Sequence, residues 1–561
     1  MDKFPDPVKW VNYYHDKSAL HVACYNKDCP NDVIRFLVEK YPAVLEHVFL
    51  VEDEMNNDNA SSLPLHYFLS RNKSVDINTV KMMVEIYPRS LMIAREGEEE
   101  YIVYPILSLV YNEHITPKDM LEIITFFHDA EPASLRVLDG DNATVLHHVC
   151  YNKYVTLELV QFLYNSWPEA IRMRAGHTGL PIHDLCRNNK IDDTVALEIL
   201  RFMLDVNPSL SREGEDYLPI HTAAGSMSFE FCKVLINAYP ESLRVGTSDG
   251  SLPIHEVCNN GGRDDQINTI HYMLELDPES INAQDGYGDL PIHRAAMYGK
   301  SNVIELLLKH DPDAASKETK YQHHHQQLPL HIVCQQDKEY LDTVKVLYDA
   351  YPEAFHKLDG DWNTPYGQRA KPIDFAMRNR KTSIVNFLQD QKRYIGDSDT
   401  DIQHLTSRTE LNDNGLTLLH RALKDKAPLG TIKLVIKGNP ATVRTADNQF
   451  AFPLHIACWF SSVKVVQYLV GESNKYILGH LDENKNSILH YACHGGNLDV
   501  VKYLITNHSS LVAAEVNKKG KLPLHLLCCE VGKDKVDIDS AEYVETIWLM
   551  LLANPEALLG A

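Results

Sequence analysis

The sequence predicts an all-α solenoid in which one helix-turn-helix-loop unit is stacked many times. Three observations support this fold class: a recurring four-residue phrase, a proline phrase often at a fixed distance from it, and helical periodicity between the two. A phrase that returns every few dozen residues indicates one structural unit that stacks on copies of itself.

The recurring phrase is Leu-Pro-Ile/Leu-His, called here the histidine phrase. Seven complete copies occupy residues 63–66, 180–183, 218–221, 252–255, 290–293, 328–331 and 522–525. Five looser copies end at His21, His147, His420, His455 and His490, and residues 104–107 and 371–374 keep the spacing without the histidine. These positions together predict about fourteen units.

Each histidine phrase is expected to open a short helix, because proline at the first helical position has a suitable φ and lacks only an amide that would be unpaired there. A second phrase, such as Tyr239-Pro240, is expected to end the second helix of the unit. Between the two, apolar residues such as Val500, Val501 and Leu504 form one helical stripe. Asp249-Gly250 and similar pairs mark a loop before the next phrase.

The units resemble ankyrin repeats, whose family phrase is Thr-Pro-Leu-His. The resemblance extends from about residue 18 to about residue 555, and it implies an ankyrin-type solenoid. The family's threonine is usually leucine here. Only Thr144 and Thr417 are therefore placed for the hydrogen bond from threonine to histidine that the family uses.

The regularity of the array predicts three segments. Residues 1–390 form an N-terminal array whose last unit is degenerate, residues 391–413 form a polar and acidic linker, and residues 414–561 form a C-terminal array of four units. The linker carries Asp397, Asp399 and Asp401, and it is alternatively a docking segment or a phosphorylation site. We expect the array to break or bend there and its unfolding to divide there.

Composition excludes several classes of function. The net charge is −23, from 77 acidic and 54 basic residues, which argues against binding to nucleic acid or to an anionic membrane. No apolar run approaches the roughly 20 residues that span a bilayer. The N-terminus also lacks the apolar core of a secretory signal. These features predict a soluble intracellular protein, cytoplasmic or nuclear.

Cysteine and histidine are numerous but follow the repeat. Eight of the 11 cysteines lie three residues after the phrase position, which predicts small buried side chains on the first helix. The phrase histidines are expected to bond backbone groups of the adjoining loop. The tract His323 to His325 stands apart, but three successive loop residues rarely point at one metal ion. The sequence carries no recognised catalytic motif, and we predict no enzyme activity, cofactor or metal.

The resemblance implies a partner-binding face built from the loop tips and the ends of the first helices. Carried over by position, the candidates are Tyr25, Tyr111, Tyr151, Arg187, Tyr217, Met297, Tyr298, Trp459 and Phe460. Aromatic residues and arginine contribute most of the binding energy at many protein interfaces. The competing interpretation is that several of these rings pack on neighbouring units.

The sequence therefore predicts a monomeric, non-catalytic scaffold that binds one or more partner proteins on the concave face of the array. Two alternatives stay open. One is the substrate-receptor subunit of a larger enzyme assembly such as a ubiquitin ligase. The other is a purely structural spacer.

Overall fold

The structure is a computed structural model. It describes residues 18–47, 49–53, 58–96, 102–176, 179–214, 216–259, 265–320, 326–359, 370–396, 415–512, 516–530 and 540–554. The chain divides into two compact units, Met1–Gly286 and Tyr287–Ala561, which are described separately.

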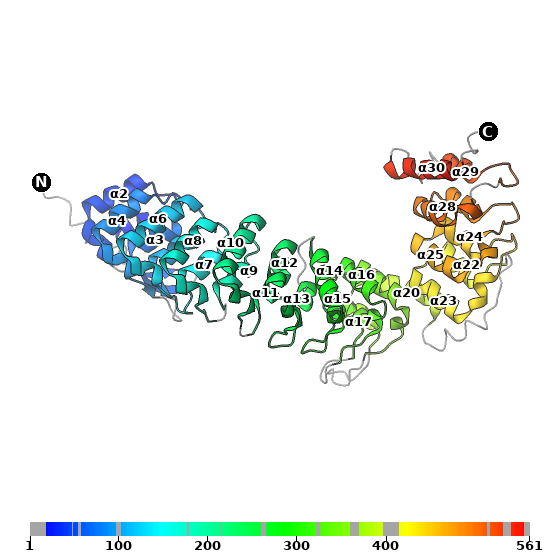
Figure 1. The fold of residues 1–561 in the computed structure, drawn as a ribbon, viewed down its shortest axis with the longest axis horizontal. Coiled ribbons are helices and arrows are strands. Elements are labelled where there is room, and N and C mark those ends of the chain that lie inside the picture. The colour runs from blue at the N-terminus through cyan, green and yellow to red at the C-terminus, as the bar shows by residue number, and fades with distance from the viewer. Residues whose placement is uncertain are drawn as a thin grey trace. The chain divides into compact units, whose positions relative to one another are not determined.

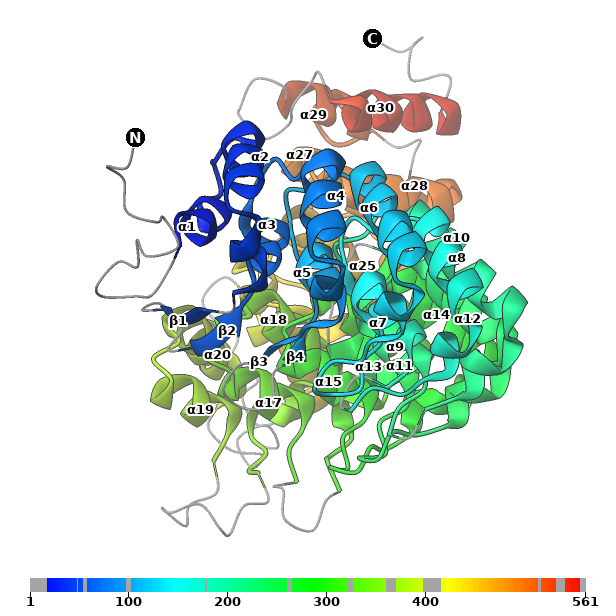
Figure 2. The ribbon, with the colours of Figure 1, turned by 90° about the vertical axis from the view of Figure 1, so that its left-hand side faces the viewer.

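Each repeat is a pair of helices, an inner helix that opens at the histidine phrase and an outer helix that follows it. In the first unit, the pairs are α1 (Ala19–Tyr25) with α2 (Asn31–Lys40), α3 (Pro64–Arg71) with α4 (Ile77–Ile86), α5 (Pro105–Val110) with α6 (Pro117–Ala130), α7 (Val145–Tyr151) with α8 (Leu157–Ser166), α9 (Pro181–Arg187) with α10 (Asp193–Val206), α11 (Pro219–Ser226) with α12 (Phe229–Ala238), and α13 (Pro253–Asn259) with α14 (Gln266–Leu276). Inner helices contact inner helices, and outer helices such as α4 and α6 lie side by side (Figures 1 and 2).

The second unit repeats this arrangement. Its pairs are α15 (Pro291–Met297) with α16 (Ser301–His310), α17 (Pro329–Gln335) with α18 (Leu341–Ala350), α19 (Pro372–Arg378) with α20 (Thr382–Ile395), α22 (Leu418–Lys424) with α23 (Leu429–Gly438), α24 (Pro453–Phe460) with α25 (Val463–Glu472), α27 (Ile488–Gly495) with α28 (Leu498–Val512), and α29 (Pro523–Glu530) with α30 (Ala541–Ala553). A short helix, α26 (Lys475–Leu478), follows α25. The described residues thus contain fourteen pairs, and the predicted all-α helix-turn-helix-loop solenoid is confirmed.

The second proline phrase ends the outer helices as predicted. Helix α12 stops at Ala238, and Tyr239 leaves helical geometry at its C-terminal end. Pro240 then begins a short 3-10 turn, which the sequence pattern did not predict. The 3-10 turns are η2 (Pro42–Glu46), η3 (Pro88–Met92), η4 (Pro132–Arg136), η5 (Pro168–Arg172), η6 (Pro208–Arg212), η7 (Pro240–Arg244), η8 (Pro278–Asn282), η9 (Ala314–Ser316), η10 (Pro352–Phe355) and η11 (Pro440–Arg444).

A small antiparallel sheet joins two of the loops near the start of the chain. Its strands are β1 (Phe49–Asp53), β2 (Asp58–Ser62), β3 (Arg95–Glu96) and β4 (Ile102–Val103), in the order β1-β2-β3-β4. Phe49 pairs with Ser62, and Ser61 pairs with Glu96. Adjacent extended loops satisfy their backbone groups by pairing, and this adds strands to an otherwise helical fold.

The core is a stripe of apolar side chains between the two rows of helices, and it includes most of the repeat cysteines. Seven of the eight cysteines at the repeat position are buried. Burial raises the pKa of the Cys334 thiol to about 12, so this side chain stays protonated. Cys528 on α29 is exposed, so its predicted burial is wrong.

Helices α18, α20 and α23 contact one another within the second unit, and α20 continues to Ile395, so residues 391–395 of the predicted linker are helical. The buried hydroxyls of Tyr348 and Thr431 lie 2.9 Å apart, and Thr431 Oγ1 donates to Gln391 Oε1 at 2.7 Å. The N–H of Gly430 donates to Asp349 Oδ1 at 2.7 Å. This group of contacts is called the seam. The division at residues 391–413 stays a prediction, and residues 397–414 lie outside the described residues.

None of the helices in the described part of the chain is both long enough and apolar enough to cross a bilayer.

Candidate partner-binding site

Five inner helices of the first unit end in the same kind of turn, which positions the first candidate residues. The four residues of each turn begin with Tyr or Arg and continue with Asn. We call these the asparagine turns; they occupy residues 25–28, 71–74, 111–114, 151–154 and 187–190. Each connects an inner helix to its outer helix.

The asparagine side chain fixes the shape of each turn. Its Oδ1 accepts a hydrogen bond from the backbone N–H two residues later, which is the local bond that favours asparagine in turns. The distances are 3.1 Å for Asn26, 2.8 Å for Asn72, 2.9 Å for Asn112, 2.7 Å for Asn152 and 3.3 Å for Asn188.

The same side chains also join each turn to the preceding helix pair. Asn112 Nδ2 donates to the carbonyl oxygens of Leu69 at 2.7 Å and Asn72 at 3.0 Å, and Asn112 is buried. The partner-binding candidates predicted from the sequence do not include these asparagines. Their recurrence directly after each candidate Tyr or Arg was the available signal for a structural role. They hold successive turns in register, so the preceding side chains form one row.

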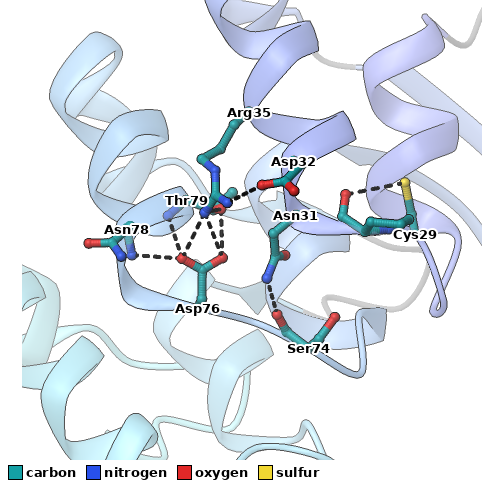
Figure 3. A network of polar contacts seen from close by, with 9 residues as sticks. Cys29, Asn31, Asp32, Arg35, Ser74, Asp76, Asn78 and Thr79 are labelled. Atoms are coloured by element: carbon teal, nitrogen blue, oxygen red, sulfur yellow. Dashed lines mark hydrogen bonds and ion pairs between the residues drawn. The ribbon is translucent and has the colours of Figure 1, made fainter.

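Polar contacts beside the second turn extend this link to the outer helices (Figure 3). Asn31 Nδ2 donates to the carbonyl oxygen of Ser74 at 2.5 Å. Arg35 Nη1 lies 3.3 Å from Asp76 Oδ1, and its other terminal nitrogen binds Asp32. Asp76 also accepts the backbone N–H of Thr79 at 3.1 Å, at the start of α4.

Tyr25 ends the first inner helix and is 37% exposed. Its ring meets the edge of the Tyr67 ring with centroids 5.6 Å apart. The guanidinium of Arg71, the equivalent residue of the next pair, lies 5.3 Å from the Tyr25 ring centre. This cation–π contact holds both side chains while leaving the tyrosine accessible.

Tyr111 and Tyr151 are 48% and 56% exposed at the third and fourth turns. The Tyr111 hydroxyl lies 2.6 Å from His148 Nδ1, and His148 Nε2 lies 2.9 Å from Asp139 Oδ2. Burial acts to raise the pKa of Asp139, but hydrogen bonds from His148 and from backbone N–H groups outweigh it, so the pKa is lowered.

A depression of about 150 Å³ opens beside these two tyrosines. Its lining combines three aromatic rings with two lysines; it includes Tyr111, Tyr151, Tyr154, Lys153 and Lys190. It therefore has room for about one side chain of a ligand.

Arg187 at the end of α9 contacts Tyr217, which lies just before α11 of the next pair. The guanidinium lies 5.2 Å from the Tyr217 ring centre, and Nη2 donates to the Tyr217 hydroxyl. Arg187 Nη1 also lies 3.4 Å from Asp184 Oδ1. Burial raises the pKa of Asp184 to about 7, because the nearby guanidinium offsets only part of the cost of desolvation. Tyr217 and His183 help to line a pocket of about 260 Å³.

The other four candidates lie in the second unit, at the ends of two inner helices four pairs apart. Met297 ends α15 and lines a pocket of about 320 Å³ with Asp289 and Arg294, and Tyr298, which follows it, is exposed. Trp459 and Phe460 end α24, and their rings stack with centroids 5.3 Å apart.

Several candidate side chains pack on a neighbouring pair, and of these Tyr25 and Tyr111 stay exposed. Tyr25, Tyr111, Arg187 and Trp459 all contact the following pair. Packing on a neighbouring unit and partner binding are therefore not exclusive interpretations, because the same side chain can do both. Partner binding at the nine positions stays a proposal.

The phrase histidines bond the backbone as predicted. His147 Nδ1 accepts the N–H of Thr144 at 3.0 Å, and Nε2 donates to the carbonyl oxygen of Gly179 in the next pair at 3.1 Å. A ring nitrogen that accepts an N–H and one that donates to a carbonyl together require a neutral imidazole. Burial accordingly lowers the pKa of His66, His147, His183 and His455 to about 4.

The two threonines of the family phrase also bond their histidines. Thr144 Oγ1 lies 2.9 Å from His147 Nδ1, and Thr417 Oγ1 lies 2.8 Å from His420 Nδ1. Where leucine replaces threonine, the backbone N–H of that leucine still bonds the ring, at 3.1 Å from Leu180 to His183. The leucine variant therefore keeps the backbone half of this contact.

Within the residues that the structure describes, three or more histidine, cysteine or carboxylate side chains nowhere converge as a metal site. The tract His323 to His325 lies outside those residues.

Comparison with known proteins identifies a family and two distant relatives. A family model described as ankyrin repeats (3 copies) matches residues 220–318, 254–359 and 474–538. The transient receptor potential cation channel subfamily A member 1 of Drosophila melanogaster is 26% identical over 140 residues, 24% of this chain and 11% of the channel. Its Caenorhabditis elegans homologue is 25% identical over 108 residues, 19% of this chain and 8% of the homologue. The chain thus spans about a tenth of the length of these relatives.

Proposed function

Because this chain is an ankyrin-repeat protein, we propose that it is a non-catalytic scaffold that binds a partner protein along the exposed ends of its inner helices. The observation that carries the proposal is the exposure of three tyrosines within this row, Tyr25, Tyr111 and Tyr151. These tyrosines occupy one repeat position, keep between a third and three-fifths of their surface exposed, and follow one another on turns fixed by asparagine.

Such a row suits binding because its side chains are large and already ordered. A tyrosine that packs one edge on the next pair loses little conformational entropy when a partner covers its other face. Tyrosine, tryptophan and arginine are also the residues that most often dominate interface energies. The candidate set is composed mainly of these three types.

The proposal includes the setting of the protein. Its net charge of −23 favours a protein partner over nucleic acid or an anionic membrane. We place it inside the cell, in the cytoplasm or nucleus, as a monomer that carries the partner. The channel relatives share only a small part of their length with it, so channel activity is not part of the proposal.

The test is affinity purification of the tagged full chain from native lysate, with two site variants. One carries Tyr25→Ala, Tyr111→Ala and Tyr151→Ala, and the other carries Tyr217→Ala, Trp459→Ala and Phe460→Ala. A control for the first variant replaces three aromatic residues elsewhere that are at least as exposed: Phe36→Ala, Phe450→Ala and Tyr476→Ala. We expect a partner to be lost from at least one site variant and kept by the control, with all circular dichroism spectra unchanged.

Other outcomes separate the alternatives. A partner kept by both site variants would overturn the proposed face. If no protein is recovered with any of the chains, the result favours the structural spacer. Recovery of ligase subunits by every variant, with a further protein lost from a site variant, would identify the chain as a substrate receptor.

A further inference from the structure

The asparagine turns reverse the charge of the chain. Their 20 residues contain six basic side chains and only Asp28 and Glu113 as acidic ones, whereas the whole chain has a net charge of −23. The basic residues are Lys27, Arg71, Lys73, Lys153, Arg187 and Lys190. A local excess of positive charge on an acidic protein attracts a ligand that the rest of the surface repels.

The two acidic residues of the turns are already paired with turn lysines. Asp28 lies 2.8 Å from Lys73 Nζ, and Glu113 lies 3.7 Å from Lys153 Nζ. Below the row, Asp139 faces His148 and Asp184 faces Arg187, so each buried carboxylate has its own cationic or hydrogen-bonding neighbour. These pairs reduce the positive charge of the turns without reversing it.

Direct bonds join three of the four neighbouring pairs of turns, and Asn152 Nδ2 of the fourth turn binds the carbonyl oxygen of Val110, directly before the third turn. The N–H of Lys73 donates to the carbonyl oxygen of Lys27 at 2.9 Å, and Asn188 Nδ2 donates to that of Asn152 at 3.0 Å. Asn112 makes the equivalent bond to Asn72. Tyrosine or arginine therefore recurs at each step along one edge, with a lysine beside most of them.

We propose that the row of asparagine turns binds an extended acidic segment of the partner protein. The carboxylates of the segment lie against the turn lysines and arginines, and one apolar side chain enters the depression beside Tyr111 and Tyr151. This inference rests on the proposed function and specifies the chemistry of the partner. Charge pairs at the rim of an interface raise the association rate and select the partner, while the aromatic contacts supply affinity.

The length of the row sets the length of the segment. Five neighbouring inner helices have four spacings of roughly 8–10 Å, so the row extends over about 32–40 Å. An extended peptide advances about 3.3 Å per residue and covers that span with about ten to twelve residues. A twelve-residue probe is therefore sufficient.

Single-stranded nucleic acid is the main competing ligand, because aromatic rings alternating with basic side chains also bind stacked bases. A peptide fits better for two reasons. Asp28 and Glu113 lie within the row and repel a continuous line of phosphates more than spaced carboxylates. A nucleic acid longer than the row would also meet the acidic remainder of the chain.

The experiment measures fluorescence anisotropy with the purified full chain and synthetic probes. The test probe is a labelled twelve-residue peptide with glutamate at alternate positions and one central leucine; matched peptides replace every glutamate by glutamine or by lysine. We expect at least tenfold weaker binding of the glutamine peptide, no binding of the lysine peptide, and weakening of the glutamate peptide as salt rises. Replacing the leucine by serine should weaken the wild-type complex about fivefold.

Two pairs of substitutions locate the site. Lys153→Gln with Lys190→Gln should weaken the glutamate peptide at least fivefold, whereas Lys40→Gln with Lys118→Gln, on outer helices, should leave it unchanged. Tyr111→Ala with Tyr151→Ala should remove the preference for leucine over serine. A twelve-nucleotide oligonucleotide serves as the competing ligand.

Three results would overturn the inference: equal binding of the glutamate and glutamine peptides, equal effects of the two lysine pairs, or tighter binding of the oligonucleotide. Failure here is distinguishable from failure of the proposed function. If the peptides fail while a lysate partner still depends on the site variants, only the acidic segment is wrong. If no partner depends on those variants, the proposed function itself is wrong.

Discussion

The side-chain amide of Asn188 donates a hydrogen bond to the backbone carbonyl of Asn152, its equivalent in the preceding helix pair, at 3.0 Å. The same amide donates to the carbonyl oxygen of Cys150 at 2.9 Å, while Asn188 Oδ1 accepts the N–H of Lys190. One buried side chain thus closes its own turn and fastens it to the neighbouring pair.

We expect Asn188→Ala to destabilise the chain by about 1–3 kcal/mol, because two carbonyls and one amide lose their partner away from water. Asn189→Ala is the control, since the neighbouring asparagine is exposed. Urea unfolding followed by circular dichroism measures both. Equal midpoints for the two variants would contradict a structural role for Asn188.

Acid should destabilise the array through its phrase histidines. The pKa of His66, His147, His183 and His455 is about 4 in the folded chain, below the usual 6.5. The unfolded chain therefore binds more protons, so stability is greatest above about pH 6.5 and falls as the pH drops towards 4. Each histidine lowers the free energy of unfolding by on the order of 3 kcal/mol over this pH window.

Urea midpoints measured from pH 7.5 to pH 4.5 test this expectation. His147→Gln should lower the urea midpoint at pH 7.5. It should also reduce the dependence of the midpoint on pH, because one imidazole with a lowered pKa is removed. A midpoint that stays constant between pH 7 and pH 5 would show that the buried rings do not control acid stability.

Asp184 should act in the opposite direction. Its pKa is raised to about 7 by burial, so the folded chain holds a proton that the unfolded chain has already lost. The favourable contribution of Asp184 to the free energy of unfolding is complete below about pH 4 and is lost as the pH rises through 7. We expect Asp184→Asn to raise the free energy of unfolding by about 1–3 kcal/mol more at pH 8 than at pH 5. Thermal unfolding at the two pH values measures the difference, and an equal effect at both would contradict it.

Gly430 should be intolerant of a larger side chain. An added Cβ would lie 2.6 Å from the carbonyl oxygen of Tyr348, across the seam between α23 and α18. We expect Gly430→Ala to force these helices apart and to cost about 1–3 kcal/mol. Gly471→Ala is the matched control on α25, where the Cβ has no neighbour within 4 Å and should stabilise by up to about 1 kcal/mol.

Calorimetry of both glycine variants also tests the predicted division of the chain. Gly430→Ala should lower the temperature at which residues 414–561 unfold and leave the rest unchanged, so that two transitions separate. A single transition that moves as a whole would mean that the seam joins both parts into one cooperative unit.

The helices could be predicted from the sequence because their signals are local. In a phrase such as Leu180 to His183, proline sets the first turn and the histidine ring accepts the N–H of the leucine, so spacing alone locates the helix start. The resemblance to ankyrin repeats, carried over by position, picked out Tyr25, Tyr111 and Tyr151 as candidates.

Other features depend on residues far apart in the chain. Asn112 lies 43 residues from the Leu69 carbonyl that it binds, and no local pattern specifies that acceptor. The pairing of β2 with β3 depends on how two unequal loops meet. The exposure of Tyr151 and the contact of Tyr111 with His148 likewise depend on packing between pairs, which periodicity does not describe.

The imidazole bonds give the array a polarity that its repeated architecture does not suggest. His147 reaches forward to Gly179 in the following pair, whereas Asn112 reaches back to Asn72 in the preceding one. A cut after the fourth pair would leave His147 without its acceptor, and a cut before the third would leave Asn112 without one. The stability of a fragment therefore depends on which end is removed, because each cut leaves a different side-chain donor without its acceptor.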